Sequence, residues 1–299
     1  MITFKQMDAL IWIVNMGSFE AAASKLNMSQ SAISKRIHEI EEAFDIEIFD
    51  RKSRNARLTH KGRELLDYCQ DIVTRRDAML ERISNKKILF SNLRLGVTEL
   101  TAMTWLPGLI EHIRADYPKV QIHPTIDVSF NLFNQLNNDL LDIIIVPDIY
   151  NDARFINTPL KSVENAWMCS PTLIPPHKEL SLSDIANYSF LTQGTQSGTG
   201  LIYERYFASR NLVLNKTIVC SNLIAQVGLA IAGLGITYLP ARALHHLITQ
   251  GKLGVIKLKP APPLVRYAVM YRADRNVGLM PDIADIAASN CNFDHFQLS

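Results

Sequence analysis

A helix predicted to begin after Ser29 carries side chains that could read DNA. Its apolar positions, which we assign to the core, are Ala32, Ile33, Ile37, Ile40 and Phe44. Its other face carries short or hydrogen-bonding side chains, which fit a major groove, and a glutamine can bond bidentately to adenine. We predict that base edges are reached by Gln30, Ser31, Ser34 and Lys35. We predict phosphate contacts beside them by Ser29 and Arg36.

A dense basic run follows this helix, although the whole chain of 299 residues has a formal net charge of only +2. Residues 51–63 hold six Lys or Arg side chains and no acidic one. Such a run suits a phosphate backbone, while a solvated basic surface is the alternative. The residues that we predict to touch phosphates or the minor groove are Arg51, Arg54 and Arg57.

Hydroxyl, amide and carboxyl side chains recur at predicted strand-to-helix turns later in the chain. The candidates for binding a small polar or carboxylate-bearing molecule are Thr98, Glu99, Thr101, Ser129, Gln193, Ser197 and Thr199. Backbone N–H groups after Thr98, and in the glycine-rich residues 194–200, would suit a carboxylate. A Glu99 side chain facing the same site would repel an anion and favour a zwitterionic or amine-bearing molecule instead.

Patterns typical of catalysis and metal binding are missing from the sequence. No HExxH, GxSxG or GxGxxG occurs, and the four cysteines form no CxxC pair. The adjacent His245 and His246 point to different faces of a helix and would not share a metal easily. We therefore predict no catalytic residue, no metal and no cofactor. For Cys169 and Cys220, inert packing is favoured over the alternative of a redox pair.

Three short helices and a β wing are predicted to position the groove-facing side chains. Thr3 caps the first helix, which Gly17 ends, and Ser18 caps the second, whose three alanines allow close helix packing. The third helix begins at Ser29, and residues 46–49 alternate as a short strand would before the basic run. This layout predicts a winged helix-turn-helix over residues 1–58.

Residues 59–90 are predicted to form one long linker helix with two apolar rows. The first row contains Leu66, Val73 and Leu80, with Cys69 and Ile83 beside it. The second row contains Leu65, Ile72 and Met79. A seven-residue repeat on a single helix is buried when a partner supplies the other half, so we predict a dimerisation helix. An amphipathic helix that lies on its own domain is the alternative.

Residues 91–299 alternate strands and helices, which predicts an α/β domain with a mainly parallel sheet. We divide it into lobe I, about 91–161 and 266–299, and lobe II, about 162–265, with a ligand cleft between them. The uncharged residues 217–241 predict a buried helix, a glycine turn and a short strand rather than a membrane span. The composition, 47% hydrophobic and 20% charged, excludes a disordered chain.

The residue pattern resembles that of the LysR-type transcriptional regulator family. The likeness is strongest at Gly17, Ser18, Phe19, Ala21, Ala22, Ala23, Leu26, residues 29–34, Ile37, Glu41, Phe49, Arg51, Leu58, Thr59 and Gly62. Looser matches are Leu140, Leu141, Asp142, residues 233–236, Leu239 and Pro240. Two positions depart from the pattern, since Asp45 stands where the family commonly has Gly and Val128 precedes Ser129 where Gly is frequent.

The resemblance implies a winged helix-turn-helix, a dimerising linker helix and a two-lobed effector domain like that of periplasmic solute-binding proteins. It implies a homodimer that assembles into a homotetramer, binds and bends double-stranded promoter DNA, and responds to a small-molecule effector. The four scattered cysteines, which suggest no disulfide framework, favour a cytoplasmic protein, and we expect no membrane contact. RNA polymerase is a further candidate partner. The alternative from the residues alone is a small-molecule binding protein whose N-terminal helices make protein contacts, and the third hypothesis is an enzyme of unknown chemistry.

Overall fold

The computed structural model describes residues 2–50, 56–84, 92–175, 179–185, 187–214, 216–259, 261–275 and 279–296. The chain divides into two compact units, Met1–Lys87 and Ile88–Ser299. Each unit has its own buried apolar core, so each is described by itself.

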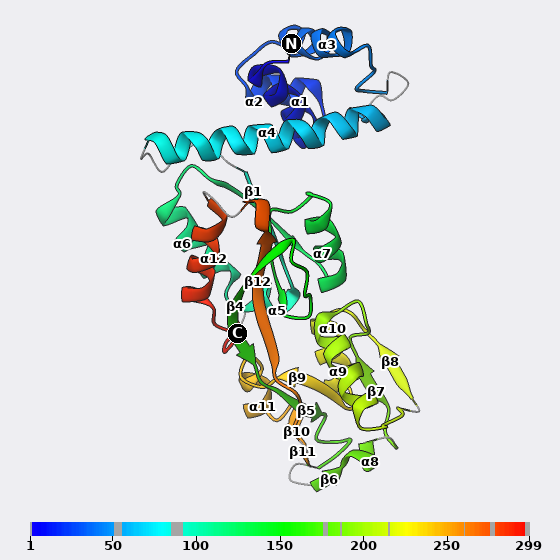
Figure 1. The fold of residues 1–299 in the computed structure, drawn as a ribbon. Helices are drawn as coiled ribbons and strands as arrows, with labels where there is room; N and C mark the ends of the chain where they lie inside the picture. The colour runs from blue at the N-terminus through cyan, green and yellow to red at the C-terminus, as the bar shows by residue number, and fades with distance from the viewer. Residues whose placement is uncertain are drawn as a thin grey trace. The chain divides into compact units, whose positions relative to one another are not determined.

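The first unit consists of α1 (Phe4–Met16), α2 (Phe19–Lys25), α3 (Gln30–Phe44) and α4 (His60–Ser84), shown in Figure 1. The predicted caps are confirmed, because Thr3, Ser18 and Ser29 each accept a backbone N–H of the first turn. Gly17 ends α1 with a φ of 73°. Asp45, in place of the expected glycine, ends α3 in the same left-handed region with a φ of 51°.

The core of the first unit combines residues from all four helices and the segment after α3. Its buried members are Met7, Ala9, Leu10, Ile13, Ala22, Ala23, Ile33, Ile37, Ile40, Ile48, Phe49, Leu66 and Cys69. The assignment of Phe44 to this core is wrong, since its side chain is 48% exposed. Phe44 is the last residue of α3, one turn beyond Ile40, and the chain turns away directly after it.

The predicted strand before the basic run is reduced to one antiparallel bridge between Phe49 and Leu58. Around it, Asp50 N donates to Arg57 O at 2.8 Å and Thr59 N donates to Ile48 O at 3.0 Å. The start of α4 lies against this segment so closely that a Cβ at Gly62 would be 2.1 Å from the Ile48 carbonyl oxygen. A glycine is therefore required there.

Lobe I of the second unit contains a five-stranded sheet in the order β2-β1-β3-β12-β4. Three strands are parallel, β1 (Asn92–Val97), β2 (Gln121–Ile126) and β3 (Ile143–Pro147), while β12 (Val265–Arg272) and β4 (Phe155–Val163) are antiparallel to their neighbours. The helices are α5 (Glu99–Thr104), α6 (Leu106–Asp116), α7 (Ser129–Asn137) and α12 (Leu279–Asn290), with the 3-10 helix η1 (Ala273–Arg275). Helices α6 and α12 lie on one side of the sheet and α7 on the other (Figure 1).

Lobe II is built from short strands. One sheet joins β10 (Gly254–Val255), β5 (Asn165–Cys169) and β9 (Thr237–Pro240), and two pairs join β7 (Phe190–Thr192) with β8 (Thr217–Val219) and β6 (Glu179–Ser181) with β11 (Lys257–Lys259). Its helices are α8 (Leu182–Ile185), α9 (Gly198–Ser209), α10 (Leu223–Ile231) and α11 (His245–Thr249). The uncharged residues 217–241 form β8, α10, a turn at Gly233 and β9, as predicted. In the part of the chain that the structure describes, every helix is too short or too polar to span a bilayer.

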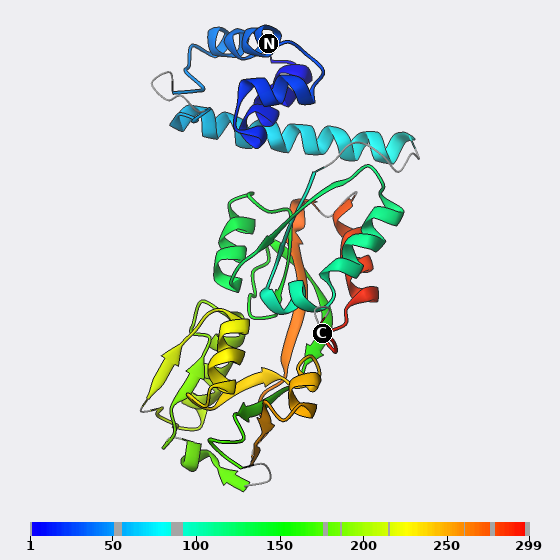
Figure 2. The same ribbon diagram turned by 180° about the vertical axis from the view of Figure 1, so that it is seen from behind.

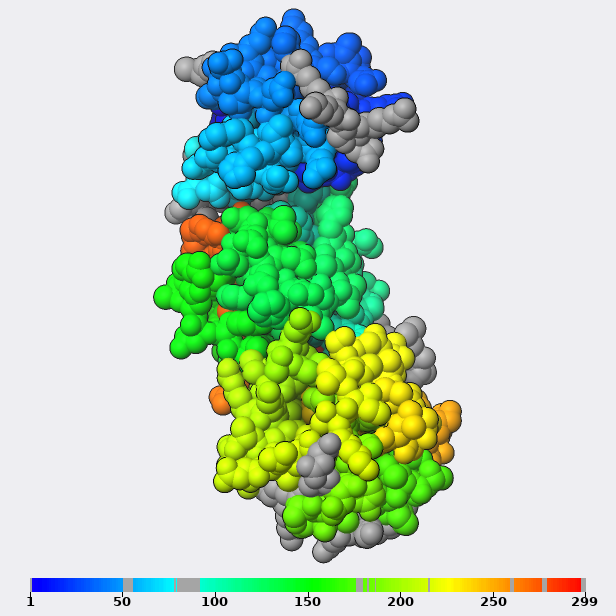
Figure 3. Space-filling model, turned by 90° about the vertical axis from the view of Figure 1, so that its right-hand side faces the viewer, coloured from blue at the N-terminus to red at the C-terminus, as the bar shows by residue number. Residues whose placement is uncertain are grey.

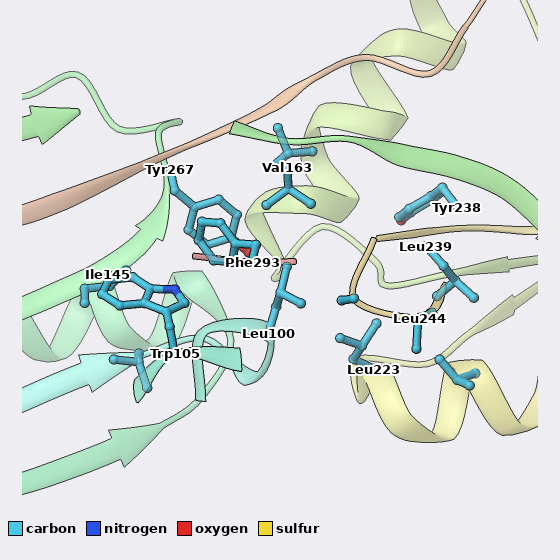
Figure 4. Packing of buried hydrophobic residues seen from close by; sticks show 14 of the residues in the cluster. Leu100, Trp105, Ile145, Val163, Leu223, Tyr238, Leu239, Leu244, Tyr267 and Phe293 are labelled. Carbon is cyan, nitrogen blue, oxygen red and sulfur yellow. The ribbon is translucent and has the colours of Figure 1, made fainter. Parts of the chain in front are cut away.

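Two segments join the lobes, one running from β4 into β5 and one entering β12 (Figure 2). One apolar cluster continues across the junction. In Figure 4, Trp105, Phe293 and Tyr267 gather on the lobe I side and Tyr238 lies on the lobe II side, with Val163 and Leu100 between the two groups. A shared core of this kind fixes the walls of any site that lies between the lobes.

Candidate functional site

The predicted groove-facing side chains of α3 lie on its solvent side. Gln30, Ser31, Ser34 and Lys35 are exposed, whereas Ile33 is fully buried behind them. Ser29 is exposed as well, and its Oγ accepts the N–H of Ala32 at 3.2 Å, which orients the first turn of the helix. The helix therefore presents short polar groups outward from a rigid, buried base.

The arginines predicted to contact phosphates differ in exposure and in their bonding partners. Arg36 is half-buried, and its Nη1 donates to the carbonyl oxygen of Lys5 in α1 at 3.2 Å, so its guanidinium lies toward α1 rather than on the outer face of α3. Arg57 is exposed beside the Phe49–Leu58 bridge. Arg51 and Arg54 lie outside the described residues.

A cavity of about 280 Å³ lies between the lobes of the second unit. Its lining residues come from both lobes and are Thr98, Glu99, Leu100, Ile126, Asp127, Val128, Ser129, Pro147, Val163, Asn165, Gln193, Ser197, Thr199, Ser221, Asn222, Leu223, Tyr238, Pro240, Val265 and Tyr267. Six of the seven effector candidates predicted from the sequence belong to this lining. Thr101 does not, because it is fully buried with its hydroxyl oxygen 3.4 Å from that of Thr98, behind the cavity wall.

The lobe I wall begins at the turn between β1 and α5. The Thr98 Oγ1 donates to the Tyr267 hydroxyl at 3.5 Å. Burial raises the pKa of Tyr267 to about 12, so this phenol stays protonated and offers both a donor and an acceptor.

Glu99 reaches from lobe I to the start of α10 in lobe II. Its Oε1 accepts the side-chain amide of Asn222 at 2.9 Å, and its Oε2 accepts the backbone N–H of Leu223 at 2.5 Å. A carboxylate at a helix N-terminus is stabilised by the unpaired N–H groups and by the helix dipole. Glu99 thus lines the cavity, and its carboxylate is bonded by the first residues of α10 in the other lobe.

A second bridge between the lobes joins the starts of α7 and α9. The Ser129 Oγ accepts the N–H of Gly198 at 3.1 Å, and Phe130 N donates to Gln196 O at 3.0 Å. Gly198 approaches Pro147 so closely that a Cβ there would lie 2.9 Å from the Pro147 Cβ. On the face shown in Figure 3, yellow-green residues of lobe II accordingly pack against green residues of lobe I.

The lobe II wall is held by a buried tyrosine pair. Tyr238 stacks on Tyr203 with ring centroids 3.6 Å apart, and its hydroxyl accepts the N–H of Gln193 at 3.1 Å. Gln193 in turn accepts the Ser197 hydroxyl at 2.7 Å. Burial raises the pKa of Tyr238, so this wall contributes neutral hydroxyl and amide groups.

The cavity walls combine polar and apolar side chains, and their charged groups are of one sign only. Among the described residues that line the cavity, none is Lys, Arg or His, whereas Glu99 and Asp127 are acidic. The Asp127 Oδ1 accepts the N–H of Val128 at 2.7 Å and the amide of Asn131 at 2.9 Å. The site therefore offers hydroxyl groups, amides and two carboxylates.

Several lining residues escaped the sequence analysis. They are Asp127, Asn165, Ser221, Asn222, Tyr238 and Tyr267. Asn222 carried a usable signal, since it caps α10 through the N–H of Ala225. The two tyrosines carried none, because they stand within strands that the sequence marks only as apolar.

No cysteine belongs to the described lining of the cavity. Within the described residues, no group of three His, Cys, Asp or Glu side chains could hold a metal ion. Cys169 is buried, and burial raises the pKa of its thiol to about 11, which fits inert packing.

A helix-turn-helix unit followed by a two-lobed unit with an interlobe cavity defines a ligand-responsive DNA-binding protein. The description "Bacterial regulatory helix-turn-helix protein, lysR family" matches residues 4–63, and "LysR substrate binding domain" matches residues 90–285. The chain belongs to the LysR family of transcriptional regulators. It has a helix-turn-helix DNA-binding domain and an effector-binding domain, and it is not an enzyme.

Similar proteins of this family cover nearly the whole chain. The HTH-type transcriptional regulator SoxR of Arthrobacter sp. (strain TE1826) is 26% identical over 272 residues, 90% of this chain and 91% of that protein. The transcriptional activator CmpR of Synechocystis sp. (strain ATCC 27184 / PCC 6803 / Kazusa) is 25% identical and covers 93% and 92%.

Solved structures share the fold. A full-length OxyR variant from Pseudomonas aeruginosa has a TM-score of 0.75 at 18% identity, covering 98% of this chain and 97% of that chain. Full-length CbnR complexed with its target DNA has a TM-score of 0.60 at 14% identity, covering 97% and 100%. The complete architecture of this chain is thus a known one.

Proposed function

We propose that this regulator binds promoter DNA as a homodimer assembling into a homotetramer, and that a small polar molecule in the interlobe cavity changes this binding and the DNA bend. One observation carries the effector part of the proposal. Hydroxyl and amide groups from both lobes line the cavity together with aliphatic side chains, and Glu99 and Ser129 of lobe I each bond lobe II there. A molecule bound there would change how the lobes hold one another.

The DNA part of the proposal is supported by the exposed side of α3. Gln30 and Ser34 are exposed one helical turn apart, on a helix whose opposite side is buried. We assign base contacts to Gln30, Ser31, Ser34 and Lys35, and phosphate contacts to Ser29 and to Arg57 with the other wing arginines. Arg36 is a weaker candidate, since it bonds α1.

Substitution of Gln30 tests the DNA contacts. We expect Gln30→Ala to weaken binding to the operator by roughly 10- to 100-fold, since one good bidentate base contact is worth about 1–3 kcal/mol. Binding to unrelated duplex DNA should change little. Arg57→Ala should weaken both and reduce the slope of log affinity against log salt by about 0.9 per lost phosphate contact.

The measurement is fluorescence anisotropy on a footprinted promoter fragment across a salt series. Lys252→Ala, an exposed charge in the second unit, is the matched control and should bind like the parent protein. If Gln30→Ala binds the operator as tightly as the parent protein does, Gln30 makes no base contact. Salt-independent binding, or none, would favour the alternative in which the N-terminal helices contact proteins.

The dimer is supported by an apolar row on α4. Tyr68, Ile72 and Met79 are 65%, 42% and 51% exposed on the described protomer. In contrast, Leu66 and Cys69 are buried in the core of the first unit, and Leu65 and Val73 pack against that core, so this part of the helix lies on its own domain. Side chains of Leu80 and Ile83 lie outside the described residues.

Location and further partners follow from regulation at a promoter. We assign the protein to the cytoplasm, where promoter DNA and small metabolites are both accessible in a bacterium, with RNA polymerase as a further candidate partner. Footprinting of polymerase together with the regulator on the same fragment tests this assignment.

A further inference from the structure

We propose that the effector carries a positively charged ammonium group and binds through it to the acidic wall of the cavity at Asp127 and Glu99. This inference rests on the proposed function, because it names the chemical class of the molecule that the interlobe cavity takes. It concerns one charged group, which amines and amino acids share.

The first step is the charge of the cavity. Among its described lining residues, two are carboxylates and none is a base. An anionic effector would be desolvated beside two carboxylates with no cation to offset either, which is costly in a partly enclosed site. A cationic effector would instead be attracted by both carboxylates.

The second step concerns the anion-binding positions that the lobes possess. The start of α10 is filled by the protein itself, since the Glu99 carboxylate takes the N–H of Leu223 and the amide of Asn222. At the start of α9, Gly198 N donates to Ser129 and Gly200 N donates to Ser197. A free carboxylate would have to displace these internal acceptors. The chain has therefore supplied its own anion at the start of α10. The starts of α5 and α7 have no side-chain cap and also line the cavity, but the carboxylates of Glu99 and Asp127 stand beside them and would repel an anion there.

The third step is the supply of acceptors for an ammonium group. The Asp127 Oδ1 accepts two bonds from lobe I, while no hydrogen bond within the described residues uses its Oδ2. An ammonium group has three donors and no acceptor. It would match the Asp127 carboxylate together with the oxygens of neighbouring lining hydroxyls, and bonds between two charged groups are the stronger ones.

The fourth step is size. A volume of about 280 Å³ lies just below the range usual for drug-sized ligands. A small amine or an amino acid fits this volume. In an amino acid, the carboxylate would face the remaining hydroxyl groups of the lining, such as those of Thr98 and Thr199.

The experiment uses the full-length protein and measures thermal shift followed by calorimetric titration. The probes are the common amino acids and, for each, the amine that lacks the carboxylate and the carboxylic acid that lacks the amine; L-norvaline, butylamine and pentanoate form one such matched set. We expect every compound that binds to carry an ammonium group. If the amine without a carboxylate binds, the effector is an amine. If binding requires both the ammonium group and the carboxylate, the effector is an amino acid.

Two variants locate the ammonium group. Asp127→Asn keeps the Oδ1 acceptor that holds Val128 and Asn131, so the fold is retained while the charge is lost. We expect it to weaken the binding of the best ammonium probe by roughly 10- to 100-fold, as loss of a charged hydrogen-bond partner does. Glu99→Gln should weaken the same probe and improve binding of the matched carboxylic acid. Glu111→Gln, an exposed acid on α6, is the control and should bind like the parent protein.

Three results would overturn the inference. They are binding of a deaminated acid more tightly than its amino acid, unchanged affinity of Asp127→Asn and Glu99→Gln, and failure of every ammonium probe to bind. Operator binding by the same preparations is measured in parallel. If the parent protein does not bind the operator, the proposed function is contradicted. If it binds the operator but binds carboxylic acids in preference to ammonium compounds, only the ammonium inference is contradicted.

Discussion

Asp142 joins three parts of lobe I through one buried carboxylate. It accepts the backbone N–H of Arg94 at 2.8 Å, the Arg94 guanidinium at 2.7 and 3.0 Å, and Arg275 Nη1 at 2.8 Å. The side chains of Asp142 and Arg275 are only 11% and 9% exposed. Asp142, directly before β3, therefore pairs with arginine charges in both β1 and η1, and Arg275 has a second carboxylate partner in Asp139 at 3.0 Å.

We expect Asp142→Asn to lower the free energy of unfolding of the second unit by about 2–4 kcal/mol, because it removes the carboxylate that pairs with Arg94 and one of the two that pair with Arg275. Urea denaturation followed by circular dichroism measures the change. Asp116→Asn, an exposed acid at the end of α6, is the control and should stay within about 0.5 kcal/mol of the parent protein. Equal stability of the two variants would show that the Asp142 pairs contribute nothing.

Hydroxyl residues at helix starts could be predicted as candidate site residues from local sequence, whereas the bonds that Glu99 and Tyr267 make across the fold could not. Ser29, Ser129 and Ser197 stand at the starts of helices, where a hydroxyl beside unpaired N–H groups is a local sequence signal. The roles of Glu99 and Tyr267 depend on partners more than 120 residues away along the chain. Such contacts are set by the tertiary fold, and no local pattern encodes them.

Elements with local signals followed the prediction, and elements defined by distant pairing did not. Helices α1 to α3 begin and end where capping residues placed them. Strand β4 was missed because it pairs with β12, about 110 residues later, and carries Pro159 within an alternating, half-exposed segment. The predicted wing strand is a single bridge for a related reason. Alternation over residues 46–49 does not determine how many residues pair with another strand.

Helix α4 uses its two apolar rows differently, which gives a prediction at the scale of one element. We expect Ile72→Glu to weaken dimerisation by roughly 100-fold or more, because it buries a charge without a partner on the exposed row in both protomers. Sedimentation velocity over a concentration series measures the dissociation constant.

Thr74→Glu is the matched control for this helix. Thr74 is exposed two residues along the same helix, on a side distinct from both apolar rows, and its hydroxyl bonds only the Gln70 carbonyl. It should dimerise like the parent protein. A dimer of unchanged strength for Ile72→Glu would mean that this row is not the interface.

The described residues of the two units have separate hydrophobic cores, one cluster in Met1–Lys87 and two clusters in Ile88–Ser299. Apolar burial is the main stabilising term of a fold, so units with separate cores unfold with separate stabilities. The DNA-binding unit is small and the effector unit is more than twice its length. A given loss of free energy should therefore shift the melting temperature of the smaller unit further.

We expect differential scanning calorimetry of the full-length protein to show two transitions that respond to different changes. Ile33→Ala, at a fully buried position in α3, should lower only the transition of the first unit, by roughly 10 °C or more for a loss of about 2–5 kcal/mol. Asp142→Asn should lower only the second transition, and an ammonium probe should raise only that one, because it binds the native cavity and not the unfolded chain. If either substitution lowered both melting temperatures equally, the two units would unfold as one cooperative unit. Effector binding would then stabilise the DNA-binding unit directly, and the two units would not be independently folded parts.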